Sequence, residues 1–199
     1  SPYSNFSLNF DGATNYIDCG NISSLNSTQK FSISYWFKIS DFLSIKRFLG
    51  TYSGSTSNWI ANLFNSSVGL TFVVRNNDTS KADLEVVSSG KIAVDTWQHI
   101  SMVYDGSQSG NDNRLKVYLN GNLETLTFTG TIPASTPSNL TGAFNIGSAA
   151  YSVQGAKEID ETAIFNKALN QAEISQIYNN GYAADLTSLS PVSWWRLGE

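Results

Sequence analysis

Strict alternation of apolar and polar residues over positions 31–39 is the feature that most constrains what this 199-residue chain can fold into. A period of two sends successive side chains to opposite faces of an extended strand. One face is made of Phe31, Ile33, Tyr35, Phe37 and Ile39, and the other carries mainly serine and lysine. The pattern predicts a strand with one face buried in a core and the other facing solvent.

Comparable segments recur along the chain, separated by clusters of Gly, Asn, Asp and Ser that favour turns. Asn120 and Gly121 stand between two of them and are the pair that a type I′ hairpin prefers. The spacing predicts an all-β chain with two packed antiparallel sheets and one domain over residues 1–199. The further strand candidates are 8–10, 48–52, 59–64, 70–75, 84–87, 98–104, 115–119, 123–128, 143–146 and 158–165.

One segment near the C-terminus departs from the β periodicity. Asn170 is followed three residues later by Glu173, as in a capping box, and the apolar residues after it share one helical face. Because Gly181 supplies a stop signal, we predict a short helix over residues 171–179. The tail, residues 186–199, is too apolar for a free linker, so we expect an edge strand or the junction to a following domain.

Composition argues against several functions. Charged residues make up 14% of the chain, and the net charge is −4 with the basic residues scattered. A nucleic-acid partner would require a basic face, so none is expected. No stretch approaches the ~20 apolar residues of a membrane span, so membrane insertion is not expected either. Cys19 is the only cysteine, which excludes an intrachain disulfide.

The order of several short motifs is more specific than any one of them. The motifs are Phe10-Asp11-Gly12, Ile33-Ser34-Tyr35-Trp36-Phe37, Trp97-Gln98-His99-Ile100, Tyr104-Asp105-Gly106, Val117-Tyr118-Leu119-Asn120-Gly121, Ile146-Gly147 and Glu158-Ile159-Asp160-Glu161. In this order the chain resembles the laminin-G-like domains of the concanavalin A-like lectin/glucanase superfamily. The resemblance implies a two-sheet antiparallel jelly-roll sandwich. It does not imply a ligand, because that superfamily includes lectins, pentraxins, adhesive repeats and hydrolases.

The resemblance also suggests a setting. The closing residues, from Trp194 to Glu199, are similar to the joints between repeats of large phage-tail or bacterial surface proteins. We therefore predict a non-catalytic carbohydrate-binding or adhesion module of a larger extracellular, cell-surface or virion protein. Its expected partners are a glycan or cell-surface polysaccharide and neighbouring domains of the same polypeptide. The alternative is a purely architectural or protein-docking repeat, and a glycoside hydrolase is a third possibility.

The acidic segment Glu158-Ile159-Asp160-Glu161 tests the enzyme hypothesis. Glucanases of the superfamily carry Glu-x-Asp-x-(x)-Glu on one strand, where two carboxyls about 5 Å apart perform retaining hydrolysis. Alternation places Glu158 and Asp160 on one face and Glu161 on the opposite face, so the motif is incomplete. His99, the only histidine, is expected to be structural. We therefore expect no catalytic residues.

The loop after Phe10 suggests a structural calcium site. Calcium takes six to eight oxygen ligands, and Asp11 and Asn15 supply side-chain oxygens that Asp160 would join if the first and last strands are adjacent. The alternative is that Asp11 and Asp160 only cap turns through their own hydrogen bonds.

Glycan recognition is predicted on loops or on the concave sheet. Aromatic faces stack on sugar C–H surfaces, while amides and guanidinium groups bond hydroxyls. The candidate residues are Tyr52, Trp59, Arg75, Asn77 and Tyr151. Trp36, Trp97, Trp194 and Trp195 are assigned to the framework instead.

Overall fold

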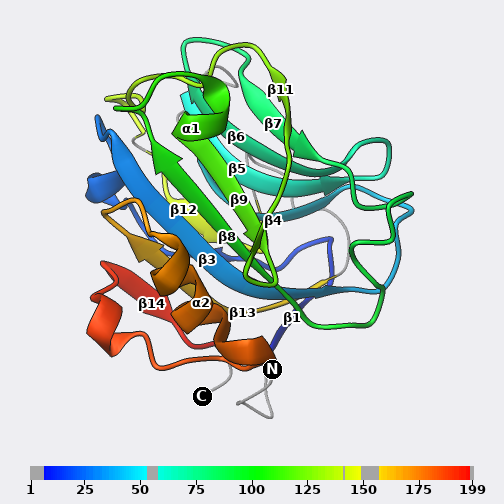
Figure 1. The fold of residues 1–199 in the computed structure, drawn as a ribbon. Coiled ribbons are helices and arrows are strands. Elements are labelled where there is room, and N and C mark those ends of the chain that lie inside the picture. Colours follow the sequence, from blue (N-terminus) through cyan, green and yellow to red (C-terminus); the bar gives the residue numbers. More distant parts are fainter. Residues whose placement is uncertain (1–6, 53–57, 141, 149–156, 198–199) are drawn as a thin grey trace.

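The protein folds into two antiparallel sheets packed face to face, in a computed structural model that describes residues 7–52, 58–140, 142–148 and 157–197 (Figure 1). Within these residues each sheet has seven strands. Sheet A has the order β1 (Leu8–Phe10), β13 (Lys157–Phe165), β3 (Lys30–Ile39), β8 (Gln98–Asp105), β9 (Leu115–Leu119) and β10 (Asn122–Leu123), with β14 (Ser193–Trp195) also paired to β13. Sheet B has the order β11 (Thr127–Thr129), β7 (Lys81–Leu84), β6 (Gly69–Asn76), β5 (Asn58–Asn65), β4 (Lys46–Tyr52), β12 (Phe144–Ile146) and β2 (Ile17–Asp18). The predicted all-β jelly-roll sandwich is confirmed.

Most of the predicted strands agree with the structure to within two residues, and two of them differ more. The strand expected at 84–87 begins earlier, at Lys81, and ends at Leu84. The single strand expected over 123–128 is wrong, because β10 ends at Leu123 in sheet A and β11 begins at Thr127 in sheet B. Between them the chain crosses from one sheet to the other, and Leu126 packs against the core on the way. The hairpin prediction is confirmed, since Asn120 and Gly121 both have positive φ and join β9 to β10.

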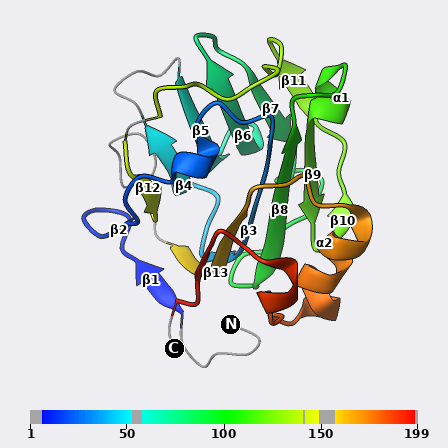
Figure 2. The same cartoon turned by 90° about the vertical axis from the view of Figure 1, so that its left-hand side faces the viewer.

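The central strand β3 is buried on both faces, which differs from the prediction of one solvent-facing side. Its apolar alternation lies in the core between the sheets, as expected. The opposite face is covered by helix α2 (Gln171–Tyr178) and the segment that follows it, which lie on the side of sheet A away from sheet B (Figure 2). A second apolar cluster, called here the outer cluster, fills this layer with Val103, Tyr118, Ala163, Phe165, Leu169, Ile174, Ile177, Leu186 and Leu189.

Helix α2 begins at the predicted residue and ends at Tyr178, one residue before the predicted end. The Asn170 side chain accepts from the N–H of Glu173 at 3.0 Å, and the Glu173 carboxylate accepts from the N–H of Asn170 at 2.8 Å. These two bonds form the predicted capping box. At the other end Asn179 adopts the left-handed conformation, with φ 47°. In the described part of the chain, no helix is both long and apolar enough to cross a bilayer.

Two glycines with positive φ separate the cost of backbone strain from the cost of steric overlap. Gly20 has φ +71° and nothing within 4 Å of an added Cβ, whereas Gly147 has φ +86° and an added Cβ would lie 2.2 Å from the Phe10 ring. We expect Gly20→Ala to lower the free energy of unfolding by about 1 kcal/mol and Gly147→Ala by about 2–4 kcal/mol. Urea unfolding of both variants measures the difference. Equal losses would contradict the packing of Phe10 against this turn.

Candidate functional site

The outer face of sheet B carries the predicted glycan-binding residues that the structure describes. Trp59 of β5 is paired with Tyr52 of β4 on one side and with Arg75 of β6 on the other. Directly opposed residues of antiparallel strands share a face, so the register places all three positions in one row. Tyr52 is placed by backbone register alone, and Tyr151 lies outside the described residues. The sequence thus named residues that the fold brings together.

A pair of asparagines, Asn58 and Asn77, lies where β5 begins and β6 ends. Asn77 follows β6, and its N–H donates to Asn58 Oδ1 at 2.6 Å. Asn58 Nδ2 donates in return to Asn77 Oδ1 at 3.2 Å. Asn77 is exposed and has φ 57°, a conformation that asparagine tolerates better than most residues. Because successive side chains of a strand alternate, the Asn58 side chain points to the face of β5 opposite that of Trp59, and the pair lies at the end of the two strands.

Trp59 is the central residue of this face. It packs with Ala61, Leu63 and Val73, and only 7% of its surface is exposed. The Arg75 guanidinium carbon lies 5.4 Å from the centroid of the Trp59 ring. Burial lowers the pKa of Arg75, whose Nε donates to the carbonyl of Ser80 at 3.2 Å. The Trp59 indole N–H is buried and has no acceptor among the described residues.

The acidic segment of β13 does not follow simple alternation. The register of β13 against β3 shifts between Asp160 and Ala163, and Glu161 has φ 50°. This bulge turns the Glu161 side chain to the outer face of sheet A, where its carboxylate accepts from Trp194 Nε1 at 2.7 Å. The expectation that Glu161 points to the opposite face from Asp160 is therefore wrong, because the bulge breaks the period of two.

Each of these acids is engaged by a neighbour. Glu158 forms an ion pair with Lys38 at 2.7 Å and accepts from the Ser7 hydroxyl at 2.8 Å. Asp160 is buried and accepts from the N–H of Glu161 at 2.8 Å. The segment therefore presents no open pair of carboxyls of the kind that glycoside hydrolysis uses.

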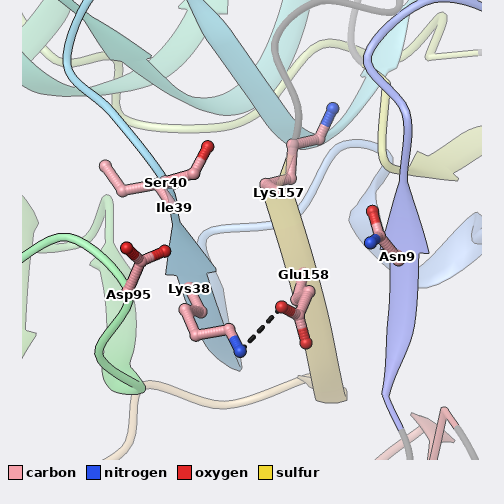
Figure 3. A pocket seen from close by; sticks show the side chains of 7 residues that line it. All are labelled: Asn9, Lys38, Ile39, Ser40, Asp95, Lys157 and Glu158. Carbon is pink, nitrogen blue, oxygen red and sulfur yellow. Dashed lines mark ion pairs between the residues drawn. The ribbon is translucent and has the colours of Figure 1, made fainter.

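A small hollow lies beside the Lys38–Glu158 ion pair (Figure 3). It has a volume of about 80 Å³ and lies between β1, β13 and the end of β3. The Lys157 ammonium points away from it and donates to the carbonyl of Gly147 at 2.8 Å, and burial lowers the pKa of this lysine to about 8. A space of this size holds a few waters rather than a sugar residue.

His99 is packed as a structural residue. It is fully buried, its Nε2 lies 2.7 Å from the Ser34 hydroxyl, and its ring is 5.1 Å from that of Trp36. Burial lowers the pKa of His99 to about 3, so the imidazole is neutral near pH 7. A neutral, enclosed imidazole has no access to a substrate.

The residues predicted to bind calcium do not form one set of ligands. The Asp11 carboxylate accepts from the N–H groups of Ala13 and Thr14 at 2.8 and 3.0 Å and from the Thr14 hydroxyl at 2.9 Å. Phe10, the residue before Asp11, pairs with Lys157, and Asp160 lies three residues, about 10 Å, farther along β13. Among the described residues no group of three or more His, Cys, Asp or Glu is placed to hold a metal ion. Calcium binding stays a prediction.

Comparison with known proteins establishes the family. A family model described as the concanavalin A-like lectin/glucanases superfamily matches residues 11–175. The chain belongs to this superfamily. None of the curated proteins compared matches it.

Solved structures of the same fold are distant in sequence. An inferred carbohydrate-binding protein of Bacteroides ovatus has a TM-score of 0.64 at 14% identity, over 93% of this chain and 50% of its own. The botulinum neurotoxin serotype D binding domain has a TM-score of 0.59 at 14% identity, over 86% and 41%. Domain 4 of the extracellular arabinanase AbnA from Geobacillus stearothermophilus, in complex with arabinotriose, has a TM-score of 0.52 at 19% identity, over 78% and 69%. This superfamily member therefore spans half or less of the first two chains.

The buried imidazole makes a pH prediction. His99 has a pKa of about 3 in the folded chain and about 6.5 when unfolded. The unfolded state therefore binds the extra proton first, and stability falls as pH drops from 6.5 towards 3. At pH 5 the loss from this residue is about 2 kcal/mol. We expect His99→Gln to lose that much less between pH 7 and pH 5 in urea unfolding. Identical pH profiles for the two proteins would contradict the buried neutral imidazole.

The Asp11 turn provides the test of the calcium prediction. In chelator, Asp11→Ala should lower the melting temperature, because the turn donors lose their acceptor. If the turn also binds calcium, Ca²⁺ raises the melting temperature of the natural protein and not that of the variant. The exposed Asp112 provides the control Asp112→Ala. Equal Ca²⁺ responses in the natural protein and Asp11→Ala would exclude calcium at this turn.

Proposed function

We propose that the chain is a non-catalytic carbohydrate-binding module and that the outer face of sheet B is its saccharide-binding face. Its superfamily includes lectins, and the structures of similar fold include a protein described as carbohydrate-binding and a domain bound to arabinotriose. Identities below 20% carry the fold alone, so the choice of ligand rests on the chemistry of the face.

The buried indole N–H of Trp59 is the observation that carries the proposal. An indole nitrogen only donates, and a buried donor without an acceptor costs about 1–3 kcal/mol. Several described side chains have a buried polar atom of this kind, and Trp59 is the one that lies in the row formed with Tyr52 and Arg75. Because this N–H is buried, a saccharide hydroxyl supplies an acceptor and recovers that cost only if binding displaces the groups that cover the indole.

The neighbours of Trp59 match the polar side of a saccharide. Arg75 brings a planar set of N–H donors next to the ring, and Asn77 adds an exposed carboxamide. A few fixed polar groups around an apolar centre are typical of small-ligand sites. The apolar centre here is Trp59, and the buried side chains of Ala61, Leu63 and Val73 pack against it.

The setting of the module is part of the proposal. The chain matches about half or less of several longer proteins, which supports a module joined to other domains. Toxin receptor-binding domains and an extracellular arabinanase share its fold, which supports an extracellular location for the module. A place on a cell surface or virion remains a prediction from the closing sequence motif.

Replacing Trp59 with phenylalanine removes the indole N–H and keeps an aromatic ring, so it measures the contribution of the N–H to binding. A glycan array, with arabinotriose added, first identifies a ligand of the natural protein, and calorimetry then compares variants. We expect Trp59→Phe to bind about 5–10-fold more weakly, the loss of one hydrogen bond, while the free energy of unfolding stays equal or rises by about 1 kcal/mol.

Trp97→Phe is the matched control, because Trp97 lies on the other sheet beside Lys38. It should leave affinity unchanged. A natural protein that binds no glycan would favour an architectural or protein-docking repeat instead. Undiminished binding by Trp59→Phe would move the saccharide site away from this face.

A further inference from the structure

A groove on the other side of the molecule lies between the end of α2, the segment after it and β14. Its volume is about 570 Å³, compared with about 80 Å³ for the hollow of Figure 3. This is within the range of about 300–1,000 Å³ that small-ligand pockets occupy. Its side chains come from β13, α2 and the C-terminal segment, with Glu161, Gln176, Asp185, Trp194 and Arg196 as the large polar and aromatic members.

Glu161 lies at the base of this groove in an unusual state. Its φ of 50° is rare for a residue with a long side chain, and only 5% of its surface is exposed. Strained backbone and buried charge both persist only where the surroundings enforce them, and they concentrate at functional sites. The seven other described non-glycine residues with positive φ are all asparagine, aspartate or serine, and asparagine and aspartate tolerate this conformation.

The Glu161 carboxylate orders the two groups beside it. One oxygen accepts from Trp194 Nε1 at 2.7 Å, and the other lies 3.6 Å from Arg196 Nε. The Arg196 guanidinium carbon is also 5.0 Å from the centroid of the Trp194 ring. Trp194 packs on the outer cluster from its inner side and remains partly exposed. The arrangement holds an aromatic ring and a planar set of donors in place before any ligand arrives.

The rim adds neutral and acidic acceptors. Gln176 is exposed, and its amide donates to the Ser188 hydroxyl at 2.9 Å. Asp185 is exposed and accepts from the N–H of Thr187 at 2.9 Å. Two carboxylates, Glu161 and Asp185, stand against the single guanidinium of Arg196, so the charge of the groove disfavours an anionic ligand.

We propose that this groove is a second saccharide-binding site, specific for neutral sugars and independent of the Trp59 face. Carboxylate, carboxamide and guanidinium groups at fixed positions match the hydroxyl groups of a sugar, and the indole matches its C–H surface. The groove lies on the outer side of sheet A, whereas Trp59 lies on the outer face of sheet B. Each site is therefore open to a separate test. From the sequence, Trp194 was expected to be a framework residue. This holds for the side of the indole that packs on the outer cluster, whereas the side chain also lines the groove.

Indole N–H signals in nitrogen-15 NMR spectra of the full chain report both sites at once. Trp59→Phe and Trp194→Phe assign the two signals by their loss. The probes are lactose, cellotriose and arabinotriose, with 3′-sialyllactose as the acidic counterpart of lactose. We expect at least one neutral probe to shift the Trp194 signal saturably with a Kd of about 1 mM or tighter. The sialylated probe should be weaker than lactose.

Exposed rim residues provide variants that keep the fold. Gln176→Ala and Arg196→Ala should each weaken the shift of the Trp194 signal about fivefold or more, and Trp97→Phe should leave it unchanged. A Trp194 signal that is present but unmoved by all three neutral probes would overturn the proposal. Glu161 would then have only a structural role, holding β14 through its hydrogen bond with Trp194. A shift at Trp59 alone would keep the saccharide site on sheet B and remove the second site. A shift at Trp194 alone would keep the groove as a saccharide site and remove the Trp59 face.

Discussion

Burial of both faces of β3 is the constraint on which the rest of the structure depends. One face is buried by sheet B, which any sandwich provides. The other face carries Trp36, Ser34 and, from β8, His99, and it would be exposed without α2 and the C-terminal segment. The outer cluster closes this layer with aliphatic side chains from α2 and the tail. The C-terminal part of the chain is therefore part of the packing of the central strand.

The layer formed by α2 and the C-terminal segment explains why His99, Asp160 and Glu161 are buried. Apolar burial supplies about 25 cal/mol per Å², but it also encloses an imidazole and two carboxylates that would be solvated on an open sheet. His99 adapts by staying neutral, since burial lowers its pKa to about 3. Glu161 remains engaged with the tail through Trp194 and Arg196. The bulge that turns Glu161 outward thus links the packing of the tail to the groove next to it.

The two candidate sites have different physical bases. On sheet B the row through Trp59 results from strand register, which places residues from three strands next to each other. Beside sheet A, the groove results from how α2 and β14 dock onto β13. Strand register makes a flat row whose central indole is almost covered, whereas docking of the tail leaves a hollow with a partly exposed indole. Their saccharide affinities are accordingly expected to be independent.

The sequence by itself determined the local structure. Alternation identified β3, the Asn120-Gly121 pair identified the hairpin of β9 and β10, and the capping box identified α2, because each of these depends on neighbouring residues only. The order of motifs determined the superfamily, and the chemistry of aromatic and polar side chains named Trp59 and Arg75 as glycan-binding candidates. Tertiary structure decided the rest. It buried the second face of β3, separated Asp11 from Asp160, and formed the groove at Trp194. The bulge at Glu161 depends on contacts between β13 and a strand more than thirty residues away, which no local period can report.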